Sequence, residues 1–129
     1  MNPEKLLSRH SLGNGLTLEF WDHSRPVAGD RWYVALECRI TIPVKVGNLP
    51  PDLRSQAGEV RAALGPEFVF SQKDERNFIA AQEVPEILQE MEARALDLAA
   101  NYFAHPDFAR RLLRKKYADH LQKRRRYTS

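Results

Sequence analysis

The segment from Arg31 to Ile42 alternates between two kinds of side chain for twelve residues. One set is Trp32, Val34, Leu36, Cys38, Ile40 and Ile42, and the other is Tyr33, Ala35, Glu37, Arg39 and Thr41. A period of two residues places these sets on opposite faces of a β-strand. The pattern predicts a long antiparallel strand with one buried face, and it leaves Glu37 on the solvent face. Pro43 cannot donate to a strand ladder, so we expect the strand to end there.

A turn signal lies further towards the N-terminus, at Gly13-Asn14-Gly15. Glycine and asparagine tolerate positive φ, which tight hairpin turns require. The turn separates a possible short strand over residues 6–12 from a second alternating run. In that run Leu16, Leu18 and Phe20 are expected to face the core, and Trp21 the other side.

The rest of the chain is richer in helical patterns. We expect helices over residues 52–64, from Pro85 to about Phe103, and from about Pro106 or Asp107 to Lys123. Residues 68–70 start another strand, and residues 72–82 form one strand, two strands or a strand and a turn. Strands and helices that are segregated in this way predict an α+β fold. We expect one domain over residues 1–129, with an antiparallel sheet of about four strands, two or three helices and a frayed C-terminus.

The helix after Pro85 carries an apolar stripe at helical spacing. Its members are Ile87, Leu88, Met91, Ala95, Leu98, Ala99 and Tyr102. Leu96 and Phe103 lie off this stripe, and the last helix adds Phe108 and Leu112. One modest sheet leaves part of this apolar surface uncovered, and uncovered patches often mark interfaces. We therefore expect these four side chains to form the interface of a homodimer.

Positive charge is concentrated at the C-terminus. The last 24 residues hold nine lysines and arginines and two acidic residues, whereas the first 105 hold 11 basic and 15 acidic residues. A basic C-terminal helix attracts acidic protein surfaces or polyanions, although many charged helices only stay solvated. The candidate binding residues are Arg110, Arg111, Arg114, Lys115 and Arg125.

A second candidate site is the segment between the two clearest strands, residues 22–31. Loops held by a rigid sheet often bind ligands, and arginine pairs suit carboxylates or phosphates. The candidate ligand-binding residues are Asp22, Ser24, Arg25, Asp30 and Arg31. The alternative is a structural loop in which the arginines pair with Asp22 or Asp30 and a side chain caps a turn.

About 30 residues around this segment resemble part of a PilZ domain, a family that binds cyclic di-GMP. The resemblance lies in Ser11 to Leu18, in Gly29-Asp30 and in the alternating strand that follows. It implies a cyclic-nucleotide sensor that uses residues 22–31. The family motifs RxxxR and (D/N)xSxxG are not matched, because Lys5 stands at the first arginine position before Arg9, and the motif glycine falls two positions late after Ser24, at Gly29.

Signatures of catalysis, metal binding and cofactor binding are missing from the sequence. The four histidines lack paired metal-ligand spacing, and Cys38 lies on the apolar face of its strand. The sequence predicts a soluble, cytoplasmic protein with no membrane span and no cofactor. We expect a small binding or adaptor protein without catalytic activity that contacts a protein partner or itself through its C-terminal helices. The alternatives are a nucleic-acid-binding protein that uses residues 107–126 and a sensor of a small anionic ligand or cyclic nucleotide.

Overall fold

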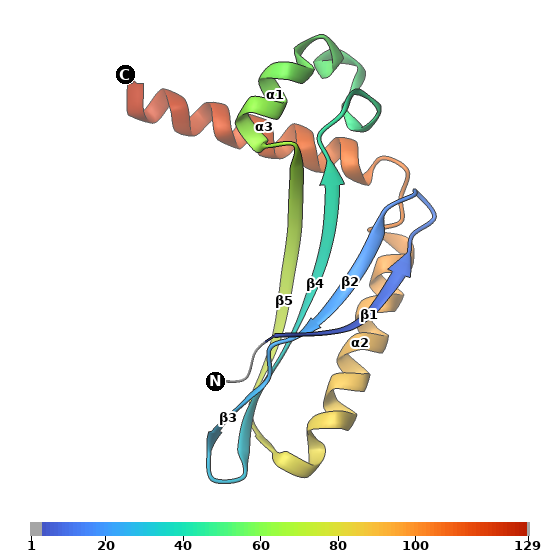
Figure 1. Ribbon diagram of the computed structural model, residues 1–129, viewed down its shortest axis with the longest axis vertical. Coiled ribbons are helices and arrows are strands. Elements are labelled where there is room, and N and C mark those ends of the chain that lie inside the picture. The colour runs from blue at the N-terminus through green and yellow to red at the C-terminus, as the bar shows by residue number, and fades with distance from the viewer. Residues whose placement is uncertain (1–3, 129) are drawn as a thin grey trace.

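The computed structural model describes residues 4–128, and these form an α+β fold as predicted (Figure 1). Five strands make one antiparallel sheet: β1 (Lys5–Ser11), β2 (Thr17–Asp22), β3 (Arg25–Ala28), β4 (Arg31–Pro43) and β5 (Glu67–Ala80). The three helices are α1 (Ala57–Leu64), α2 (Val84–Asn101) and α3 (Phe108–Thr128). Short 3-10 helices cover Val46–Asn48, Pro51–Gln56 and Ala81–Glu83.

Strand β4 is the centre of the sheet. One of its edges pairs with β2 and then with β3, and the other edge pairs with β5 from Arg31 to Pro43. The predicted alternation is confirmed on the inner face, where Val34, Leu36, Ile40 and Ile42 are buried. The predicted face of β2 is also confirmed, because Leu18 and Phe20 are fully buried opposite Ile40 and Cys38.

Helix α2 covers the inner face of the sheet and packs mainly on β4 (Figure 1). Its Met91 and Ala99 join the core side chains of β2 and β4 in one hydrophobic cluster. Helix α3 crosses the end of the sheet where β5 begins, and α1 packs beside it there. The last turns of α3 extend past β5, beyond the edge of the sheet (Figure 1). None of the helices in this described part of the chain is long and apolar enough to span a membrane.

Residues 67–80 form one continuous strand, which decides between the alternatives left open for residues 72–82. The charged run Lys73 to Arg76 stays in the ladder because each of its members pairs with β4. Register shifts between Trp32 and Val34, where β5 carries an extra residue. Phe78 lies in this bulge with φ of 55° and is 71% exposed.

Several predicted boundaries were wrong. The expected loop over residues 22–31 contains the short strand β3, which forms a tight hairpin with β4. The expected helix over residues 52–64 begins as a 3-10 helix and becomes α1 only at Ala57. Helix α2 ends at Asn101 rather than Phe103, and α3 continues to Thr128, past the expected end at Lys123.

The apolar stripe predicted for α2 is correct over most of the helix and wrong at its end. Leu98 and Tyr102 are exposed, whereas Phe103 is buried. The helix stops before Phe103, and the following turn redirects that side chain into the core. Asn14 fixes this turn from the β1–β2 hairpin, since its Nδ2 donates to the carbonyls of Phe103 and His105 at 2.8 and 3.0 Å.

The burial pattern of β4 and β5 generates a stability prediction. Leu36→Ala should lower the free energy of unfolding by about 2–5 kcal/mol, because it removes a fully packed side chain and leaves a cavity. The matched control is Val69→Thr on the outer face of β5, where the side chain is 51% exposed. It keeps the β-branched shape and should change stability by about 0.5 kcal/mol or less. Urea unfolding measures both, and equal losses would contradict the assigned inner face.

Candidate functional site

A groove lies between β5, α2 and α3, with a volume of about 630 Å³. Strand β5 supplies the floor with Phe70 and Gln72, and one wall is formed by Leu98 of α2 and by Tyr102 directly after that helix. Helix α3 and the turn before it form the other side, with Phe103, His105, Phe108, Arg111, Leu112, Lys115 and Lys116. The groove therefore exists because α2 covers β4 but leaves the inner face of β5 beside it open.

Aromatic rings form the inner part of this groove. The ring centroids of Phe70, Phe103 and Phe108 lie 5.3 to 5.6 Å apart in edge-to-face contacts. Tyr102 extends the cluster towards solvent, with its ring 5.4 Å from that of Phe103. Rings that pack on one another by their edges make a rigid apolar wall, which costs little entropy when a ligand docks on it.

The exposed part of the groove combines apolar and basic side chains. Leu98 is 64% exposed and Tyr102 is 65% exposed, although both are large and apolar in character. Arg111, Lys115 and Lys116 stand along the α3 side of the same groove. An exposed apolar patch with a charged rim is typical of a protein interaction site. Leu98 and Tyr102 were not predicted to be exposed, because the helical stripe placed both of them in the core.

The five predicted basic residues fall into four separate environments. Arg111 and Lys115 line the groove, whereas Arg125 is exposed on the projecting end of α3. Arg114 points to the other side, where its guanidinium donates to both carboxylate oxygens of Asp52 at 2.6 and 2.9 Å. Arg110 pairs with Asp107 at 3.4 Å, at the start of the helix. The structure therefore does not bring these five side chains together in one binding face.

The four predicted interface residues are already covered within the chain. Phe103 and Phe108 are buried in the core, and Leu96 and Leu112 are half-buried against it. A homodimer interface at these positions stays a prediction, and only Leu96 and Leu112 among the four keep part of their surface open. The apolar surface that stays open on α2 is Leu98 and Tyr102 instead.

The predicted ligand loop uses its polar groups to hold its own backbone. Asp22 accepts a hydrogen bond from the Ser24 amide at 2.8 Å, and Ser24 Oγ accepts one from the Ala35 amide at 3.1 Å. The two arginines of this segment, Arg25 and Arg31, also have partners nearby in the sequence. Arg31 lies 3.7 Å from Asp30, and Arg25 stacks over the Tyr33 ring with its guanidinium carbon 5.0 Å from the centroid.

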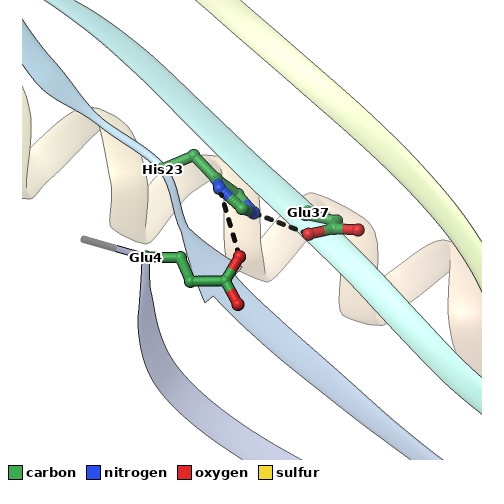
Figure 2. A group of neighbouring side chains, drawn as sticks. All are labelled: Glu4, His23 and Glu37. Carbon is green, nitrogen blue, oxygen red and sulfur yellow. Dashed lines mark hydrogen bonds and ion pairs between the residues drawn. The ribbon is translucent and has the colours of Figure 1, made fainter. Parts of the chain in front are cut away.

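A polar network lies on the outer face of the sheet, around Glu37 (Figure 2). His23 Nε2 is 2.6 Å from Glu37 Oε1, and its Nδ1 is 3.7 Å from Glu4 Oε2. Arg39 Nη2 lies 2.8 Å from both carboxylates, and Ser71 Oγ donates to Glu37 Oε2. Glu37 is only 8% exposed, so the expectation that it faces solvent was wrong.

The same network controls the ionisation of Glu37. Burial alone would raise the pKa of this carboxyl, but hydrogen bonds from Arg39, Ser71 and His23 outweigh it and lower the pKa from 4.5 to about 2. A carboxylate that is both buried and fully bonded is stable in its charged form. Glu37 therefore remains ionised and ties β4 to β5 and to the residues that follow β2.

The chemistry of this network favours a structural role. A nucleophilic serine needs a hydrogen bond to its base, but here Ser71 donates to the carboxylate rather than to His23. Glu4, His23 and Glu37 offer ligand atoms within 4.8 Å of one another, which is close enough to hold a metal ion. However, Arg39 already neutralises both carboxylates, so a divalent cation would have to displace its guanidinium.

Comparison of the chain with protein-family profiles, with curated proteins and with solved structures gives no significant match.

The pKa of Glu37 generates a prediction for stability against pH. Because the folded-state pKa is lowered, its stabilisation is present above pH 4.5 and is lost as the pH falls towards 2. Glu37→Gln should remove that part of the pH dependence and destabilise the protein at pH 7. Urea midpoints at pH 7, 4.5 and 3 measure it. The control is Glu90→Gln on the exposed face of α2. In this variant the urea midpoint should depend on pH as it does in the unmodified protein. If the urea midpoint of Glu37→Gln depends on pH as strongly as that of the unmodified protein, the lowered pKa of Glu37 is contradicted.

Proposed function

We propose that the protein acts by binding, and that the groove between β5, α2 and α3 holds an acidic, partly apolar segment of a partner protein. The observation that carries this proposal is the exposure of Leu98 and Tyr102 beside a buried aromatic cluster. A partner that covers these side chains removes their apolar surface from water, and full burial of a leucine side chain contributes about 1.5–3 kcal/mol.

The charges of the groove support an acidic partner. Arg111, Lys115 and Lys116 line one side, and carboxylates of a partner would pair with them at the rim while apolar side chains enter the centre. Stacking of successive bases needs several open ring faces, and this cluster offers only that of Tyr102 because Phe103 and Phe108 are buried. The groove therefore favours a protein over a nucleic acid. An adaptor of this kind needs no catalytic group.

We also place the protein in the cytoplasm. Its single cysteine, Cys38, is free and buried on the inner face of β4. Burial raises the pKa of this thiol, as do the nearby carboxylates of Glu37 and Asp74. A thiol of this kind is an inert core group and fits a reducing compartment.

A defined peptide tests the groove. A labelled peptide in which glutamates alternate with leucine and phenylalanine should bind, and the same peptide with lysines in place of glutamates should bind at least tenfold more weakly. The paired change Leu98→Ser and Tyr102→Ser should weaken binding of the acidic peptide by about tenfold or more, because such anchors dominate docking. Fluorescence anisotropy measures the affinities.

Two controls make this test specific. Val46→Ser alters an exposed apolar residue outside the groove and should leave the affinity unchanged. Lys115→Glu should weaken binding of the acidic peptide and strengthen binding of the basic one. Equal affinity of both peptides, or an unaffected Leu98 and Tyr102 double variant, would refute the proposal.

A second candidate is binding of nucleic acid by the projecting end of α3. The observation in its favour is that Lys123, Arg125 and Arg126 are exposed where α3 extends past the sheet (Figure 1). Phosphates are attracted to such a cluster without any reading of the base sequence.

Salt dependence tests this candidate. Replacing Lys123, Arg125 and Arg126 by glutamine should lower the slope of log affinity against log salt by about one unit for each lost phosphate contact. Lys5→Gln, an exposed change on β1, is the control and should keep the slope. Electrophoretic shifts with single-stranded and double-stranded oligonucleotides supply the affinities. The absence of any shift at low salt would exclude this candidate.

A further inference from the structure

The second edge of β5 is open along the middle of the strand. One edge pairs with β4, and no other strand within residues 4–128 pairs with the second. Ser71, Gln72, Lys73, Asp74 and Glu75 are all exposed. An open edge presents a row of backbone donors and acceptors that a further strand can satisfy.

We propose that this edge pairs with β5 of a second copy, antiparallel and centred on Asp74, so that two sheets join into one across a two-fold axis. Isologous contacts of this kind are the commonest way in which identical chains close into dimers. The added strand would lie about 4.8 Å from β5 in the plane of the sheet. The groove lies above the inner face of β5, so the second strand widens its floor and leaves its opening free.

The charges of β5 are compatible with this register. Opposite residues of an antiparallel pair share a face, so both inner faces stay on one side only if the axis passes through a residue. Centring on Asp74 places Lys73 opposite Glu75 of the second copy, twice in the dimer, and Gln72 opposite Arg76. Centring on Lys73, Asp74 or Glu75 places a like-charged pair at the axis in each case, which is destabilising. Only at Asp74 does a salt bridge within the same strand, to Arg76, offset that pair among the described residues.

The register also fits the shape of the strand. Residues 71–77 are the part of β5 between Phe70, which α3 and α2 approach in the groove, and the bulge at Phe78. Asp74 is the middle of this segment. The Asp74 carboxylates that meet at the axis are each compensated by Arg76 of the same strand, whose Nη1 lies 2.7 Å from Asp74 Oδ1. Charged residues on an edge usually oppose strand addition, but here the alternation of sign makes the edge complementary to itself.

A second charge match follows from the same symmetry. Helix α3 lies at the start of β5, and α2 begins directly after its end. Antiparallel pairing brings the end of one β5 beside the start of the other, so the first turns of α2 from the second copy face the projecting end of α3. The exposed Glu83, Glu86 and Glu90 would then approach the exposed Lys123, Arg125 and Arg126. The opposite charges of the two helices thus become complementary in the dimer.

Mass and cross-linking test the proposal. Light scattering on the full chain should give twice 14.9 kDa, and a mass of 14.9 kDa up to millimolar concentration would overturn it. Asp74→Cys should form a disulfide-linked dimer on mild oxidation, because residues on the axis of an antiparallel pair lie within disulfide range. Glu75→Cys is the matched control and should cross-link much more slowly. Equal cross-linking of the two variants would overturn the register.

Charge reversal provides an independent readout. Lys73→Glu should raise the dimer Kd by about tenfold, because two attractive pairs become repulsive. Adding Glu75→Lys to the same chain exchanges the charges and should restore the Kd of the unmodified protein. Both positions are exposed, and circular dichroism verifies that the variants are folded. A dimer whose Kd is unaffected by Lys73→Glu, or is not restored by the second change, would overturn the pairing.

Discussion

The arrangement of this protein depends on the fact that one helix is too narrow to cover the whole sheet. A helix with its side chains is about 10–12 Å across, and neighbouring strands are about 4.8 Å apart, so one helix covers about two strands. Helix α2 packs mainly on β4 and shares its core with β2, which leaves the inner face of β5 uncovered. Two features follow from this single constraint: the groove beside Phe70 and the polar inner face of β5 from Gln72 onwards.

Helix α3 closes only one end of the uncovered region. Phe108 of α3 and Phe103 of the turn before it pack against Phe70, which completes the core at the start of β5. Beyond that point β5 carries Gln72, Asp74 and Arg76 on its inner face, and these side chains need no cover. The apolar and polar halves of this one strand therefore divide the open side of the molecule into a groove and a hydrophilic edge.

Patterns of period two were enough to predict the central strands β2 and β4, but not the short strand β3. The alternation of Leu16 to Phe20 and of Trp32 to Ile42 identified the buried faces of β2 and β4, because each strand has one apolar side. The α+β class followed from the order of the elements. Glu37 was misplaced because its partners His23 and Ser71 lie 14 and 34 residues away, and no local pattern reports contacts over such separations.

The candidate site was less predictable than the fold. The basic residues of α3 were identified, but their division among Asp52, Asp107 and the groove depends on how the helix crosses the sheet. Phe103 lies in the core in place of the predicted Tyr102 because α2 ends at Asn101. Predicting buried residues from helical spacing requires the helix to continue, so the prediction was wrong at the last turn. His105-Pro106 near that turn was the available sign that the helix ends.

The two hydrogen bonds of Asn14 have a consequence for the order of folding. They join residues 89 and 91 positions apart, although the hairpin turn that holds Asn14 is entirely local. A ribosome adds residues at about 5–20 per second, so the hairpin leaves it on the order of ten seconds before the turn that accepts these bonds. During that interval Asn14 Nδ2 has only water as a partner, whereas Asn14 Oδ1 can already accept the hydrogen bond from the Leu16 amide within the hairpin. The two bonds between the hairpin and the turn after α2 therefore form later than the β1–β2 hairpin, whose own pairing is local.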